Sequence, residues 1–121
     1  MGQGSIIGYE INEKTCQISF YNEKDLEPDT LEVDTDNYQI QLIIGKLRDT
    51  WAYGKEAKRL VTIKDGFTAT RLLSKSLAGD KIEFGEETYD AVWLLSQFIQ
   101  MSLQSFPEID GIVFTVPSDE Y

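Results

Sequence analysis

The chain has 121 residues, enough for one domain, and 41% of them are hydrophobic, so it can bury a core without disulfides or metals. Its 21 acidic and 11 basic residues give a net charge of −10, which argues against binding to nucleic acid or to an anionic membrane. Histidine is absent and Cys16 is the single cysteine, which excludes an imidazole base, an internal disulfide and a cysteine zinc site. The longest apolar run is residues 91–95 and no basic leader is present, so we expect a cytoplasmic protein.

The N-terminal region predicts a hairpin of two strands. Residues 5–10 form a short apolar run, and residues 15–22 alternate, with Cys16, Ile18 and Phe20 on one face. The short polar segment 11–14 between them suits a tight connection. We therefore expect Cys16 to be a buried small apolar side chain, and we expect a third short strand at residues 30–33, inside an acidic stretch.

The middle of the chain predicts strands followed by short helices. Residues 38–47 are strand-like, residues 50–53 return as a second strand after a turn at Arg48-Asp49, and Gly54 precedes a helical turn over residues 55–60. The pattern of residues 67–78 indicates a helix ended by Gly79.

The C-terminal third predicts a helix and a buried strand. Two strands, 81–84 and 88–89, flank a turn at residues 85–87, and a helix is predicted over residues 90–106. Its main apolar stripe is Val92, Leu95, Ile99, Leu103 and Phe106, and an adjacent stripe is Ala91, Leu94, Phe98 and Met101. Residues 111–116 are continuously apolar, which is typical of a strand buried on both faces. Because other elements usually cover such a strand, we expect the natural chain to continue past Tyr121.

Three segments, in this order, resemble the N-terminal part of the actin-like ATPase superfamily, which includes actin and the heat-shock chaperone ATPases. Residues 7–18 (Ile-Gly-Tyr-Glu-Ile-Asn-Glu-Lys-Thr-Cys-Gln-Ile) are similar to the first phosphate motif of that superfamily. Residues 51–57 (Trp-Ala-Tyr-Gly-Lys-Glu-Ala) resemble the chaperones' segment that opens a helix after a strand pair. Residues 109–117 (Ile-Asp-Gly-Ile-Val-Phe-Thr-Val-Pro) resemble the apolar strand that ends in Thr-Val-Pro. Within the superfamily, the chain is most similar to divergent bacterial members.

The resemblance implies an α/β fold, an RNase H-like subdomain of an actin-like ATPase. Its mixed sheet would hold strands 5–10, 15–22 and 30–33 in antiparallel order, with strand 111–116 parallel to the first. The long amphipathic helix 90–106 would cover one face, and residues 38–80 would form a smaller inserted region. Residues 1–121 would be a single domain and the N-terminal portion of a longer ATPase fold.

The resemblance also implies a site on the first hairpin. Glu10 would take the acidic position that holds a hydrated metal, and Asn12, Glu13, Lys14 and Thr15 would be the other cofactor-binding positions. Asn12 stands where the family has glycine, and asparagine tolerates a positive φ better than most residues. Glu13 and Lys14 stand where hydroxyl side chains are expected, so the motif is degenerate: Glu13 would repel a triphosphate and Lys14 would partly compensate.

The function implied is that of one part of a nucleotide cleft. With downstream segments that supply a second phosphate motif and an adenosine motif, the intact protein would bind ATP and Mg²⁺. The chain alone would bind neither and would show no hydrolysis. Two alternatives remain open: a pseudo-ATPase whose phosphate hairpin has decayed, and an acidic protein–protein interaction module. The expected partners are the downstream remainder of the same domain and a second copy of the chain, and neither nucleic acid nor a membrane.

Overall fold

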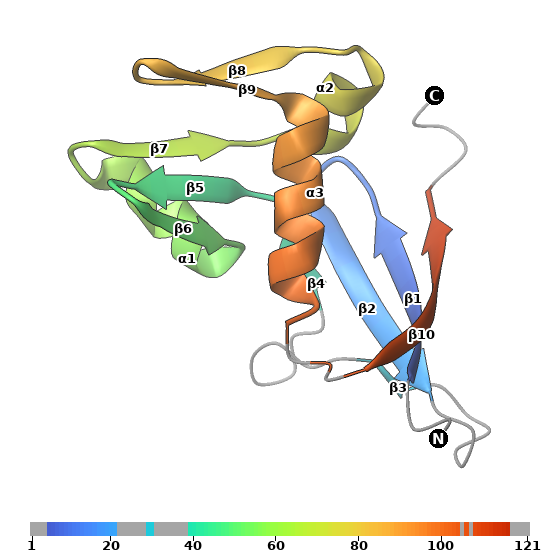
Figure 1. Ribbon diagram of the computed structural model, residues 1–121. Helices are drawn as coiled ribbons and strands as arrows, with labels where there is room; N and C mark the ends of the chain where they lie inside the picture. Colours follow the sequence, from blue (N-terminus) through green and yellow to red (C-terminus); the bar gives the residue numbers. More distant parts are fainter. Residues whose placement is uncertain (1–4, 22–28, 31–38, 105, 107, 117–121) are drawn as a thin grey trace.

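The computed structural model describes residues 5–21, 29–30, 39–104, 106 and 108–116. These residues form two β-sheets, a separate two-stranded hairpin, short helices and a longer helix, α3 (Ala91–Ser102), that stands between the two sheets (Figure 1). In the described part of the chain, no helix combines the length and the apolar character needed to cross a membrane.

The larger sheet has five strands, and they are β1 (Ser5–Ile11), β2 (Thr15–Tyr21), β3 (Asp29–Thr30), β4 (Gln39–Gln41) and β10 (Ile109–Thr115). Their order is β10-β1-β2-β3, and β4 pairs with the first residues of β2 on the same edge as β3. β1 runs antiparallel to β2 and parallel to β10, so the predicted mixed sheet is confirmed. Of the predicted strand 30–33, only residue 30 is described, and residues 31–33 lie outside the described part.

The inner face of this sheet follows the alternation of the sequence. Ile7, Tyr9 and Ile11 of β1 are 0–4% exposed, and Cys16 and Ile18 of β2 are 1% exposed. Side chains on successive residues of a strand point to opposite faces, so one face of β1 and β2 enters the core. The predicted burial of Cys16 is therefore confirmed.

β10 differs from its predicted burial on both faces. It forms an edge of the larger sheet, and Ile112, Val113 and Phe114 are 38–61% exposed. Within the described residues, β10 pairs only with β1, and in Figure 1 it lies on the side of β1 and β2 away from α3. An apolar run indicates that a strand prefers to be buried, but it does not specify which surface covers it.

The smaller sheet contains β5 (Ile44–Leu47), β6 (Thr50–Tyr53) and β7 (Gly66–Ala69) in the order β6-β5-β7. The predicted turn at Arg48-Asp49 joins β5 to β6, with Arg48 at a φ of 57°. Between β6 and β7 lie the short helix α1 (Lys55–Lys58) and a 3₁₀ turn, η1 (Arg59–Thr62), where a helical turn was expected.

The single strand predicted over residues 38–47 is instead two strands in different sheets. The N–H of Ile43 donates to the carbonyl of Gln41 at 2.8 Å, which closes a three-residue turn between β4 and β5. The N–H of Gly54 then donates to the carbonyl of Ile43 at 2.9 Å. Ile40, Leu42 and Ile44 are nevertheless all buried. The apolar alternation therefore predicted which side chains are buried, but it did not predict that the chain leaves one sheet for the other at the turn.

The helix predicted over residues 67–78 is wrong in its first half. Phe67 and Ala69 pair with Lys46 and Ile44 of β5, so this segment is strand β7. The helix, α2 (Leu72–Leu77), begins only after Arg71, whose φ is 56°. The pairing partner lies far away in the sequence, and tertiary pairing overrides local helix propensity.

The end of α2 is as predicted. Gly79 has a φ of 72°, its N–H donates to Ser76 O at 3.1 Å, and the N–H of Asp80 donates to Lys75 O at 2.9 Å. These two bonds form a Schellman motif, which needs a residue in the left-handed region. The hairpin of β8 (Lys81–Phe84) and β9 (Glu87–Asp90) follows, with Gly85 at a φ of 67° in its turn.

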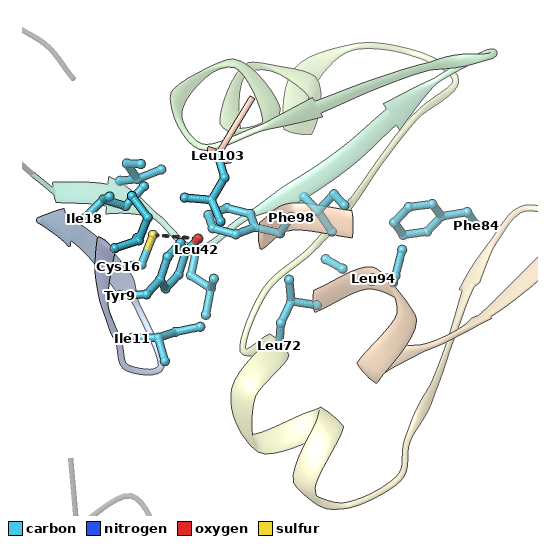
Figure 2. Close-up of a cluster of buried hydrophobic side chains, with 14 residues drawn as sticks. Tyr9, Ile11, Cys16, Ile18, Leu42, Leu72, Phe84, Leu94, Phe98 and Leu103 are labelled. Atoms are coloured by element: carbon cyan, nitrogen blue, oxygen red, sulfur yellow. Dashed lines mark hydrogen bonds between the residues drawn. The ribbon is translucent and has the colours of Figure 1, made fainter. Parts of the chain in front are cut away.

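Helix α3 (Ala91–Ser102) is shorter than predicted and turns a different stripe to the core. Its buried residues are Ala91, Leu94, Phe98 and Ser102, whereas Val92 of the expected main stripe is 56% exposed. Figure 2 shows Leu94 and Phe98 of α3 and the β1–β2 residues in one buried cluster. The two stripes are adjacent and similarly apolar, so periodicity alone could not predict which of them faces the core.

Candidate functional site

The candidate site lies where β1 and β10 end side by side. Glu10 pairs with Thr115 of the parallel strand β10 and with Gln17 of the antiparallel strand β2, and its side chain is exposed. In open α/β sheets, ligands bind beyond the carboxyl ends of parallel strands. The exposed carboxylate of Glu10 is therefore at the edge where a ligand is expected.

Asn12 organises the loop that follows. Its Oδ1 accepts hydrogen bonds from the backbone N–H of Lys14 at 2.8 Å and from that of Thr15 at 2.9 Å. The Thr15 hydroxyl donates to the same oxygen at 3.5 Å, and the backbone N–H of Asn12 donates to Thr15 O at 3.0 Å. The short loop is thus closed by a side chain that imitates a backbone turn.

Asn12 has another role than the one expected for it. The non-glycine residues with positive φ in the described ranges are Arg48, Asp65 and Arg71, so Asn12 does not use the left-handed conformation. It replaces glycine by supplying a side-chain acceptor. The sequence predicted a turn at Asn12 through a positive φ, whereas in the structure the Asn12 side chain closes that turn.

A small cavity of about 200 Å³ opens beside the hairpin. Three of the five predicted site residues line it, namely Glu10, Asn12 and Thr15, together with Gln39 and Thr115. Glu13 and Lys14 belong to the loop but are not among the lining residues. Thr115 could have been found from the predicted parallel pairing, whereas nothing in the sequence connects Gln39 with the hairpin.

Glu13 is turned toward Arg71 rather than toward solvent. Its side chain is 18% exposed, and its Oε2 lies 3.8 Å from Nε of Arg71. The same Oε2 is buried and has no hydrogen bond within the described residues. Arg71 is a component of the site that the sequence did not indicate, because its left-handed backbone occurs at a residue type that rarely adopts it.

The carbonyl of Lys14 ties the hairpin to the crossing between the two sheets. It accepts a hydrogen bond from the N–H of Leu42 at 2.8 Å, while the Lys14 side chain is exposed. Leu42 precedes the three-residue turn that leads into β5. The hairpin is therefore held at a fixed position relative to the start of the smaller sheet.

The residues present fit a magnesium–phosphate group only in part. Mg²⁺ keeps several waters and takes one or two protein carboxylates plus phosphate oxygens, and Glu10 can supply one such carboxylate. In the described ranges, no three Asp, Glu, Cys or His side chains cluster as a metal site. Phosphate oxygens would need the Lys14 and Thr15 amides, which Asn12 already occupies.

A second, larger concavity of about 590 Å³ lies between β4, β6, α1 and the end of α3. Its lining includes Gln41, Trp51, Tyr53, Met101 and Gln104. The ring of Trp51 also contacts Phe84, Tyr89 and Trp93, with centroids 5.4–6.2 Å apart.

This aromatic cluster holds Lys46. The Lys46 ammonium lies 5.2 Å from the centroid of Trp51 and donates hydrogen bonds to Glu87 at 2.9 Å and to the Tyr89 hydroxyl at 3.1 Å. The bond to Glu87 raises the pKa of Lys46 and lowers the pKa of Glu87. Trp93 stacks on Tyr89 and remains 45% exposed.

A buried hydrogen-bond chain joins the floor of the site to α3. The hydroxyl of Tyr9 lies 2.7 Å from Oγ of Ser102, which itself donates to Ile99 O at 2.8 Å, so Tyr9 is the donor to Ser102. The Cys16 thiol donates to the Tyr9 oxygen at 3.5 Å, the contact drawn in Figure 2. Burial raises the pKa of the Cys16 thiol to about 11, and burial likewise raises the pKa of Tyr9. Cys16 is therefore a protonated thiol at neutral pH, in keeping with a structural role.

Comparison with solved structures supports the fold. The chain is similar to a non-polymerising mutant of MamK, an actin-like ATPase, bound to AMPPNP, with a TM-score of 0.64 and 10% sequence identity. The match covers 100% of this chain and 35% of that one, so the chain spans about a third of the length of MamK. At this identity the likeness concerns the fold alone, and it confirms the actin-like architecture that the sequence predicted.

Sequence comparison assigns the family. No curated protein matches the sequence. The model described as "Family of unknown function (DUF5716) C-terminal" matches residues 27–120, most of the chain. The chain therefore belongs to the C-terminal DUF5716 family.

Proposed function

We propose that this chain is the hairpin-bearing part of an actin-like nucleotide-binding module, the N-terminal part of that fold. The observation that carries the proposal is the exposed Glu10 carboxylate at the joint carboxyl ends of β1 and β10, beside the cavity of about 200 Å³. A parallel strand pair that ends in an acid and a hydroxyl residue, Thr115, suits a hydrated metal with its phosphate ligand. The similarity to an AMPPNP-bound actin-like ATPase is in keeping with this ligand class.

The Mg-ATP site would be completed by segments outside this chain. Glu10 would hold the metal, and Asn12, Glu13, Lys14 and Thr15 would form the phosphate side of the cleft. Bound Mg²⁺ would neutralise phosphate charge, and the residues here would position it. The remainder of the same domain is the first expected partner, and the cytoplasm is the expected compartment.

Titration of the intact protein with Mg-ATP by calorimetry tests this proposal. We expect saturable binding that Glu10→Ala weakens about tenfold, because a charge-assisted contact contributes about 1.5–3 kcal/mol. Glu83→Ala removes an equally exposed acid from β8 and should leave the affinity unchanged. Equal effects of the two variants, or no binding at millimolar Mg-ATP, would contradict the proposal, as would ATP turnover by the 121-residue chain alone.

A second candidate is a pseudo-ATPase or acidic interaction module that works without nucleotide. It is favoured by β10, an edge strand with exposed apolar side chains and a free backbone edge among the described residues. Such edges pair readily with other strands. In sedimentation velocity, we expect nucleotide-independent self-association that Val113→Lys abolishes and Val61→Lys, at an exposed site away from the edge, does not. A monomer at all concentrations would refute this candidate.

A further inference from the structure

Three hydrogen-bond donors of the first hairpin converge on one point. The backbone N–H groups of Lys14 and Thr15 lie 2.8 and 2.9 Å from a single oxygen, Oδ1 of Asn12, and the Thr15 hydroxyl lies 3.5 Å from it. Converging backbone N–H groups form a cradle that suits the oxygen of an anion. We infer that this cradle is an oxyanion site for a phosphate-type ligand that is occupied by the protein's own Asn12, which thereby decides whether the hairpin can bind one.

Asn12 competes directly with any ligand at this site. Its side-chain carbonyl belongs to the same loop, so it reaches the two amides without losing translational freedom. An incoming oxyanion must displace it and break its hydrogen bonds to the N–H groups of Lys14 and Thr15. Removal of this internal acceptor should therefore raise the affinity for an oxyanion about tenfold or more.

Glu13 supports the closed state of the cradle. Glu13 directly precedes Lys14 in the loop, and its carboxylate is kept on the protein by Arg71, with Oε2 and Nε 3.8 Å apart. That Oε2 is buried and has no hydrogen bond within the described residues, so the ion pair is its one recorded polar contact there. A fixed negative charge at this position opposes a second anion.

The inference rests on the proposed function only for the class of ligand. Inorganic pyrophosphate has the required oxygens but no nucleoside, so it reports on the cradle alone. Failure of the intact protein to bind Mg-ATP would leave the cradle inference standing. Conversely, the intact protein could bind Mg-ATP through Glu10 while the Lys14 and Thr15 amides stay bonded to Asn12.

The test is a pyrophosphate titration of the protein, followed by the amide proton–nitrogen correlations of Lys14 and Thr15. In the wild type, we expect these two amides not to respond to pyrophosphate. In Asn12→Gly, we expect saturable shifts of both amides, with an affinity about tenfold or more above that of the wild type. Asn12→Ala gives the same test without the added backbone freedom of glycine, in case Asn12→Gly does not fold.

Two further variants separate the cradle from general electrostatics. Asn12→Asp keeps an acceptor in place and adds a charge, so it should not bind pyrophosphate. Glu13→Gln should raise the affinity modestly, whereas Glu86→Gln makes the same charge change at the exposed turn of the β8–β9 hairpin and should have no effect at Lys14 and Thr15. Wild-type amides that already bind pyrophosphate as well as Asn12→Gly, or folded Asn12→Gly and Asn12→Ala proteins that do not bind it, would overturn the inference.

Discussion

The buried hydrogen-bond chain from Cys16 through Tyr9 to Ser102 should couple β1 to α3 energetically. Tyr9 is fully buried, and its hydroxyl is 2.7 Å from Ser102 Oγ, so the Tyr9 O–H depends on Ser102 for its acceptor. Tyr9→Phe should lower the free energy of unfolding by about 1–2 kcal/mol, because one buried hydrogen bond is lost and the Cys16 thiol loses its acceptor. Ser102→Ala should lower it by about 1–3 kcal/mol, because the Tyr9 hydroxyl stays buried without an acceptor.

The double variant distinguishes coupling from two separate losses. With both hydroxyls removed, neither hydroxyl is left buried without the other, so the cost should be smaller than the sum of the single costs by about 1 kcal/mol. Urea unfolding followed by tryptophan fluorescence measures all three variants. Tyr53→Phe is the control, because the Tyr53 hydroxyl has no recorded hydrogen bond to another described residue, and it should change stability by less than about 0.5 kcal/mol. Costs that add to within about 0.3 kcal/mol would refute the coupling between Tyr9 and Ser102.

Three further predictions concern packing and pH. Gly45→Ala should destabilise the protein by about 1–3 kcal/mol in thermal unfolding, because its Cβ would lie 2.9 Å from both Leu60 Cδ1 and the Phe67 carbonyl oxygen. Gly111→Ala is the control and should not destabilise the protein, because a Cβ there would have nothing within 4 Å. Phe98→Ala should lower the free energy of unfolding by about 3–5 kcal/mol, and Val92→Ala should lower it by less than about 0.5 kcal/mol. Equal losses of stability would mean that the assignment of the buried face of α3 is wrong. Stability should fall as pH rises from about 9 to about 11, because the unfolded state releases the Cys16 proton at a lower pH than the folded state does. In a plot of the urea midpoint against pH, Cys16→Ala should flatten this decline. An unchanged plot would contradict the raised pKa of Cys16.

The hairpin was predictable because its determinants are local. Alternating apolar residues around Tyr9 and Ile18 specify which face of β1 and β2 is buried, and the short polar loop leaves few ways to connect them. The position of Glu10 beside β10 followed from the predicted parallel pairing. The hairpin could thus be predicted from residue order, whereas the parallel pairing with β10 was implied by the resemblance to the actin-like superfamily.

The remaining features depend on contacts between distant residues. Phe67 lies in a strand because its backbone pairs with Lys46 of β5. The helix or strand propensity of the local sequence does not contain this distant pairing. Arg71 reaches Glu13 because the chain adopts a left-handed conformation at a residue type that seldom does so. The sequence patterns therefore predicted the hairpin and its loop but could not identify Arg71, the cation paired with Glu13 of that loop.

The bond from Leu42 N–H to the Lys14 carbonyl has a mechanical consequence. Leu42 lies one residue before Ile43, and the carbonyl of Ile43 in turn accepts the N–H of Gly54 at the end of β6. A displacement of the Lys14 peptide is thus carried through two short bonds and one peptide unit into the smaller sheet. A ligand that shifts the Lys14 peptide should therefore also shift Leu42 and Ile43, which lead directly into β5.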